Sequence, residues 1–166
     1  MARERRRYLK IDLKWERPFR LKDGSRLNLI YSCTGLDRIR SKPGVYVFAR
    51  RFSKSVFPLY IGQALRLRGR IEQQFNNVKL MMGLKKARSG HRILLVARLS
   101  LHPGQQKKKV LDIIESALIK HALAQGHDLL NQQGTKTKVH TLKSKGNSSS
   151  RYVAPLTMLV ERKKNK

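Results

Sequence analysis

Two short stretches, Pro43-Gly44-Val45-Tyr46 and Leu59-Tyr60-Ile61-Gly62-Gln63, decide the fold that we predict for this chain. Both stretches are apolar, contain tyrosine and have the composition of β-strands. A turn-prone basic segment separates them, and an arginine-rich segment follows the second. We therefore predict two neighbouring strands over residues 44–51 and 57–62.

The segment after the second strand has apolar residues at helical spacing, namely Leu67, Ile71, Phe75, Val78 and Met82. We predict a helix from about residue 64 to 87, broken near Gly83. Residues 93–101 have the pattern of a buried third strand, and residues 106–124 that of a second helix. The order β-β-α-β-α predicts an α+β fold, with a small, mostly antiparallel central sheet flanked by helices.

The chain divides into three parts. These are a basic N-terminal arm (1–42), this central domain (43–134) and a basic C-terminal extension (135–166). In the arm, residues 19–21 and 27–30 flank Asp23-Gly24-Ser25, which predicts a hairpin because Asp-Gly favours tight turns. In the extension, we predict a mobile basic segment over residues 135–151 and a last strand over 152–161.

The composition indicates a polyanionic partner. The formal net charge is +28 in 166 residues, with a pI of about 11.3, far beyond what solubility requires. No apolar run approaches the roughly 20 residues of a membrane span, and we expect no signal peptide. Cys33 is the only cysteine, which excludes an internal disulfide and a zinc site of several cysteines. We expect a cytoplasmic protein.

Carboxylates are rare in the central domain, and Glu115 has an unusual setting. On the second helix its neighbours at i−4, i+3 and i+4 are Leu111, Leu118 and Ile119. A carboxylate on such a face is desolvated unless a cation pairs with it. A divalent metal would serve, with Asp112 as a reserve ligand. A structural ion pair with Lys120 or Arg70 explains the pattern equally well.

The first helix has a cationic face. Arg66, Arg70 and Gln74 follow one another at intervals of four residues and so share a face. Two arginines so placed become favourable when a phosphate lies between them. The alternative is a solvated cationic surface, just as Tyr46 and Tyr60 taken singly fit a core with hydroxyls at its rim.

Taken together, these residues resemble the GIY-YIG nuclease superfamily over residues 43–134. Gly44-Val45-Tyr46 and Tyr60-Ile61-Gly62 resemble its two defining tripeptides. Gln63 stands where the family often has lysine. Gln74 stands where the family often has tyrosine or histidine. The resemblance implies a catalytic set of Tyr46, Tyr60, Arg70, Glu115 and Asn131.

The resemblance also implies a mechanism. Tyr46, assisted by Tyr60, would orient or deprotonate the attacking water, and Arg70 would stabilise the phosphate. Glu115 would be the single protein ligand of Mg²⁺ or Mn²⁺, which suits a metal that keeps most of its waters. Asn131 would brace the site.

The predicted function is therefore a metal-dependent DNA endonuclease, compatible with a compact restriction-type enzyme. The candidate nucleic-acid contacts are Arg50, Arg51, Gln63, Arg66, Arg68 and Gln74. Cutting both strands of a duplex requires a homodimer or two visits by one copy. The alternatives are a catalytically inactive nucleic-acid-binding protein on the same fold, a ribosome-associated basic protein, and a toxin-like nuclease of low specificity held by an immunity partner.

Overall fold

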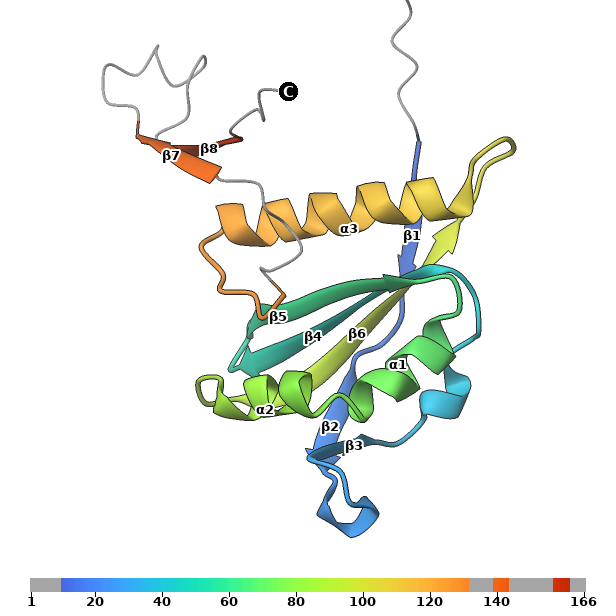
Figure 1. Ribbon diagram of the computed structural model, residues 1–166, viewed down its shortest axis with the longest axis vertical. Coiled ribbons are helices and arrows are strands. Elements are labelled where there is room, and N and C mark those ends of the chain that lie inside the picture. The colour runs from blue at the N-terminus through green and yellow to red at the C-terminus, as the bar shows by residue number, and fades with distance from the viewer. Residues whose placement is uncertain (1–9, 132–138, 144–156, 162–166) are drawn as a thin grey trace, which may run out of the picture.

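The computed structural model describes residues 10–131, 139–143 and 157–161 of the chain (Figure 1). In chain order, its elements are β1 (Asp12–Trp15), β2 (Phe19–Asp23), η1 (Ser25–Leu27), β3 (Tyr31–Cys33), η2 (Leu36–Arg38), β4 (Gly44–Phe52), β5 (Ser55–Ala64), α1 (Leu67–Phe75), α2 (Val78–Lys86), β6 (His91–Ser100), α3 (Lys107–Ala124), β7 (Val139–Lys143) and β8 (Thr157–Glu161). The fold is α+β, as predicted.

A six-stranded sheet forms the centre of the molecule, in the order β3-β2-β6-β4-β5, with β1 also paired to β6. All of its pairings are antiparallel. Helix α3 covers one face, while α1 and α2 cover the other (Figure 1). Within the described chain β5 has a strand on one side only, so it is an edge of the sheet.

Strand β4 is central because its side chains are apolar on both faces. Tyr46 and Phe48 point into the core beneath α1 and α2, whereas Val45 and Val47 pack in the clusters beneath α3. This alternation is the period of two expected of a strand. The predicted strands at 44–51 and 57–62 are confirmed, although β5 is longer at both ends.

The N-terminal arm is part of the same sheet. β1 pairs with one half of β6, from Ala97 to Ser100, and β2 pairs with Ile93 and Leu94 in the other half. The predicted hairpin exists as β2 and β3, but the proposed return strand at 27–30 is wrong. The chain winds into η1 after Asp23, which leaves the return strand to begin at Tyr31.

The first helix also differs from the prediction. The helical stretch is divided into α1 and α2 at Asn76 and Asn77, not at Gly83. Asn77 starts α2 as its N-cap, because its side-chain oxygen accepts a hydrogen bond from the Leu80 amide at 3.1 Å. The change of direction leaves Val78 67% exposed, so the predicted apolar stripe does not continue through it.

The later elements agree more closely with the sequence. β6 and α3 confirm the predicted third strand and second helix. β8 lies within the predicted last strand, whose residues 152–156 are outside the described chain. β7 forms a strand within the segment that we predicted to be mobile, and it pairs with β8 in a separate two-stranded sheet.

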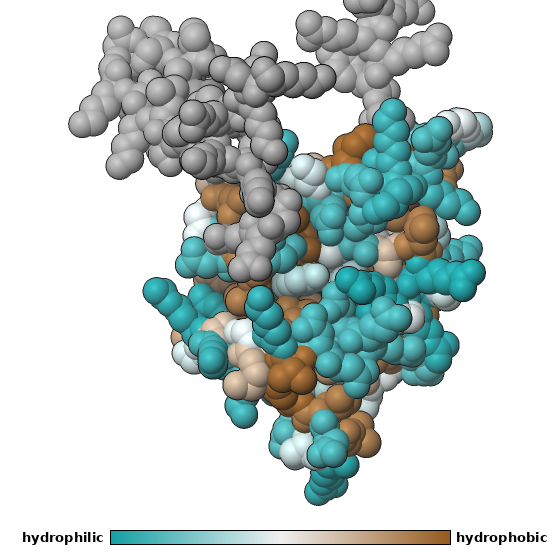
Figure 2. Space-filling model, in the orientation of Figure 1, coloured by the Kyte–Doolittle hydropathy of each residue, from teal (hydrophilic) through white to brown (hydrophobic). Residues whose placement is uncertain are grey.

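The surface is mostly hydrophilic. Hydrophilic side chains cover much of the face seen in Figure 2, with apolar patches between them. The chain has 38 Lys and Arg against 10 Asp and Glu, so cationic groups dominate its charged residues. No helix in the described ranges is both long and apolar enough to cross a membrane.

Gly62 is required by the ring of Tyr46. The two residues are opposite each other in the β4–β5 pairing. A Cβ atom on Gly62 would lie 2.5 Å from both the Cζ atom and the hydroxyl oxygen of Tyr46. Tyr46 is only 1% exposed, so its ring has little room to withdraw. The missing side chain at position 62 therefore fixes where the tyrosine hydroxyl lies.

We predict that Gly62→Ala lowers the free energy of unfolding by about 1–3 kcal/mol, because the added methyl group overpacks the core. Denaturant titration measures this change. Gly69→Ala is the matched control, since a Cβ there meets nothing within 4 Å. In helix α1 that substitution should stabilise by about 0.5–1 kcal/mol. Equal effects of the two substitutions would contradict this account of Gly62.

Candidate functional site

The two tyrosines lie together beneath α1. Their rings stack with centroids 6.2 Å apart and planes at 25°. The side-chain amide of Gln74, on α1, donates to the Tyr46 hydroxyl at 2.8 Å and faces the Tyr60 hydroxyl at 3.3 Å. Gln74 is only 3% exposed. One buried amide thus bridges the two hydroxyl groups.

The orientation of that amide follows from the start of α2. The Leu80 N–H can only donate, so the Asn77 side chain must present its oxygen to it. The nitrogen of Asn77 is then left to donate to the Gln74 carbonyl oxygen, at 3.0 Å. Gln74 must consequently turn its NH₂ group toward the tyrosines. Both tyrosine oxygens accept from Gln74, so these two hydrogen bonds do not use the tyrosine protons.

Burial keeps Tyr46 protonated. It raises the pKa of Tyr46 to about 12, mainly because the phenolate would lose its solvation. The hydrogen bond from Gln74 and the guanidinium of Arg70 both act to lower the pKa, but they do not overcome burial. The Tyr46 hydroxyl therefore stays protonated near neutral pH and can donate a hydrogen bond.

The arginines of α1 have different surroundings. Arg70 lies on the exposed side of the helix, close enough to hydrogen-bond the Tyr46 hydroxyl. Arg66 precedes the helix as its N-cap and is also exposed. Arg68 is engaged, because its Nε atom lies 3.2 Å from a carboxylate oxygen of Glu72. Arg70 is thus the arginine placed at the tyrosine pair.

Glu115 approaches from the other face of the sheet. It is half-buried on α3, and both the side chain and the backbone of Gln63 donate hydrogen bonds to its carboxylate. Burial raises the pKa of Glu115, with a further increase from nearby Asp112, while Gln63 and Lys108 oppose the shift. Gln63 also hydrogen-bonds to Asp112. Gln63 thus holds both acids of α3.

Asn131 occupies the outer edge of β5. Its amide oxygen accepts from the Ile61 N–H at 3.4 Å, and its amide nitrogen donates to the Ile61 carbonyl at 2.6 Å. The neighbouring Leu130 N–H donates to the Leu59 carbonyl at 2.7 Å. These contacts make Asn131 a structural brace of the edge strand.

The donor set at Glu115 suits a hard divalent cation. Within the described chain, ion pairs closer than 4.0 Å engage Asp12, Glu16, Glu72 and Asp112, but not Glu115. The predicted alternative of a structural ion pair with Arg70 is not among them. The same residues contain no cluster of three His, Cys, Asp or Glu side chains. One carboxylate with several waters remains a common arrangement for Mg²⁺.

Two predicted contacts lie away from this group. Arg50 stacks on the ring of Phe57, with its guanidinium carbon 3.9 Å from the ring centre, and donates to the Ser89 carbonyl. Arg51 is exposed one residue further along β4. Both arginines lie near the β4–β5 turn, whereas Tyr46 and Gly62 lie toward the other end of the hairpin.

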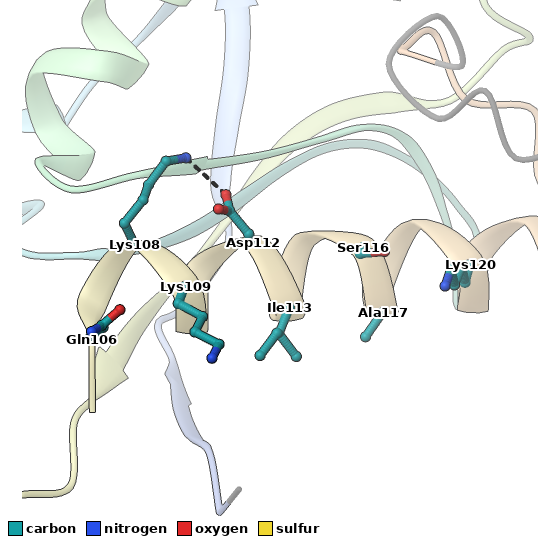
Figure 3. Close-up of a pocket in the computed structure, with 8 residues that line it drawn as sticks. All are labelled: Gln106, Lys108, Lys109, Asp112, Ile113, Ser116, Ala117 and Lys120. Atoms are coloured by element: carbon teal, nitrogen blue, oxygen red, sulfur yellow. Dashed lines mark hydrogen bonds and ion pairs between the residues drawn. The ribbon is translucent and has the colours of Figure 1, made fainter. Parts of the chain in front are cut away.

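A hollow of about 750 Å³ runs along α3 and shares Asp112 with this group (Figure 3). Its described lining residues come from one helix and its N-cap. Lys108 and Asp112 point to one side and form an ion pair at 2.8 Å, while Lys109 and Ile113 point away from them. None of the five predicted catalytic residues lines this hollow.

The chain was compared with known protein families, curated proteins and solved structures. No family model, curated protein or solved structure matches this chain.

We predict that Glu115→Gln raises the melting temperature at neutral pH. The folded-state pKa of Glu115 is raised, so its favourable contribution is present below the unfolded pKa and is lost as pH rises through the folded value. The neutral variant avoids that loss. The gain should disappear below about pH 4, where the wild-type carboxyl is protonated in both states.

Thermal unfolding from acid to neutral pH measures this difference. Glu72→Gln is the matched control, because Glu72 is exposed and paired with Arg68. It should give no gain. A Glu115→Gln variant that is less stable than wild type at neutral pH would contradict the proposed desolvation of Glu115.

Proposed function

We propose that this chain is a metal-dependent endonuclease that hydrolyses phosphodiester bonds in DNA, with a site of the GIY-YIG type. One observation carries the proposal: residues 60–63 of a single edge strand include or contact four of the five residues of the predicted catalytic set. Tyr60 belongs to the strand, Tyr46 lies over Gly62, Asn131 binds Ile61, and Glu115 binds Gln63. Arg70 joins through Tyr46.

The hydroxyls and Arg70 provide donors for an anionic phosphate. The Gln74 amide donates a hydrogen bond to the Tyr46 hydroxyl oxygen, and this bond does not use the hydroxyl proton. Arg70 adds a permanently charged guanidinium beside that hydroxyl. Donors aimed at the phosphoryl oxygens stabilise the charge that develops as the phosphodiester bond breaks. We assign Tyr46 and Tyr60 to orienting the water or the phosphate through hydrogen bonds.

Glu115 is the residue that would hold the metal, with Asp112 in reserve. A bound Mg²⁺ or Mn²⁺ would neutralise phosphate charge and lower the pKa of a coordinated water. Gln63 would orient the Glu115 carboxylate through its two hydrogen bonds. Asp112 is the weaker candidate because Lys108 and Gln63 already occupy it.

The alternative of a catalytically inactive nucleic-acid-binding protein shares the charge but has no use for Glu115. A half-buried carboxylate weakens the attraction for DNA and lies outside the ion pairs of the described chain. Its contact with Gln63, on the same strand as Tyr60, favours catalysis. The restriction-type role and the homodimer on duplex DNA remain part of the same proposal.

We predict that the wild-type protein nicks supercoiled plasmid in Mg²⁺ or Mn²⁺. Arg70→Ala should slow nicking by about 10²–10³-fold, as expected for loss of a transition-state donor, and Glu115→Ala by at least as much. Arg26→Ala is the control, because Arg26 is an exposed arginine outside the predicted nucleic-acid contacts. Lack of cleavage by wild type in either metal, or unimpaired cleavage by both variants, would refute the proposal.

We also predict that Asn77→Asp slows cleavage by about tenfold, the value of one hydrogen bond. Aspartate retains the N-cap to Leu80 but cannot donate to Gln74, whose amide should turn and present its oxygen to the tyrosines. The pH at half-maximal rate should then rise. Asn76→Asp is the control, since the Asn76 side chain bonds only to the Glu72 carbonyl among the described contacts. Identical pH–rate profiles for Asn77→Asp and wild type would contradict this role of Gln74.

A further inference from the structure

A second group of arginines lies around β2, which two strands separate from β5. A hollow of about 400 Å³ is lined by Arg17 from the β1–β2 connection, Arg20 from β2 and Arg38 from η2. Thr34 also lines it. All three arginines are exposed. Three separate segments of the chain thus bring guanidinium groups to one depression.

The acid in this hollow is already engaged. Glu16 lines the hollow, but its carboxylate lies 3.0 Å from Nε of Arg98 in an ion pair. Arg20 has a defined orientation, because its Nη2 atom lies 3.0 Å from Nδ1 of His91. A guanidinium can only donate, so His91 accepts through this nitrogen. The hollow therefore has excess positive charge.

We propose that this hollow is a phosphate-binding site, separate from the catalytic group, that holds the backbone of the nucleic-acid substrate. The proposal rests on the proposed nuclease function only for the identity of that substrate. Guanidinium forks match phosphate geometry, and the Thr34 hydroxyl offers an additional donor. A bound phosphate would also relieve repulsion among Arg17, Arg20 and Arg38.

The place of the hollow allows both sites to act on one molecule. β2 and β5 are separated by β6 and β4 in the sheet (Figure 1). Three strand spacings amount to about 14 Å. One turn of B-DNA spans about 34 Å, which is longer than this separation between the two strands. The hollow should therefore contribute to substrate affinity and leave the chemical step unchanged.

The first test compares DNA binding by wild type and by the double variant Arg17→Ala/Arg38→Ala. Fluorescence anisotropy of a labelled duplex gives the dissociation constant across salt concentrations. Loss of one phosphate contact should reduce the slope of log affinity against log salt by about 0.9. The single-turnover cleavage rate at saturating DNA should equal that of wild type.

The matched control is Arg26→Ala/Arg88→Ala, which removes two exposed arginines outside the hollow. Its slope should equal that of wild type. An unchanged slope in Arg17→Ala/Arg38→Ala, or the same reduction in both double variants, overturns the proposal. A wild-type protein that shows these slopes but never cleaves refutes the nuclease function and supports the phosphate site.

The second test identifies the source of the phosphate. Inorganic phosphate is titrated while NMR follows the Nε–H signals of Arg17, Arg20 and Arg38. Shifts that saturate in wild type and are lost for Arg20 in the double variant show a site that also accepts free phosphate. A reduced DNA slope without such shifts assigns the site to backbone phosphates alone. Both results support the proposal.

Discussion

The outer edge of β5 is the constraint on which the candidate site depends. In an edge strand, every second residue directs its backbone N–H and C=O groups away from the sheet. At Leu59 and Ile61 these groups bind the loop that contains Asn131, and at Gln63 the backbone binds Glu115. Exposed edges invite unwanted pairing, which this arrangement limits. The same contacts attach a carboxylate and an amide to the strand that contains Tyr60.

The site holds its polar groups in conditions that disfavour charge. Burial raises the pKa of both Tyr46 and Glu115, so the folded protein alone disfavours the anionic form of each side chain. Such strain is common where function, not stability, determines a residue. A cation beside Glu115 and a phosphate beside Arg70 would supply the missing charges together. The proposed function therefore implies one ternary arrangement of protein, metal and phosphate.

The sequence allowed the local elements to be predicted better than the long-range ones. The alternation around Tyr46 and the helical spacing around Glu115 are local signals, and both elements were predicted. The pairing of β1 and β2 with β6 joins residues about 75 to 90 positions apart, which no local period encodes. The break at Asn77 was missed because Gly83 is the more obvious helix breaker, although an asparagine N-cap was a usable signal. The bridging role of Gln74 depends on two strands and a second helix, so the sequence could not indicate it.

The central claim is that Glu115 and the tyrosine pair serve one metal-dependent site across β5. Paramagnetic broadening by Mn²⁺, measured by NMR on the protein bound to a short uncleaved DNA, tests it most directly. The account predicts that broadening centres on Gly62, Gln63 and Glu115, extends to Tyr60 and disappears in Glu115→Gln. Broadening centred elsewhere, or unchanged in that variant, would contradict the account.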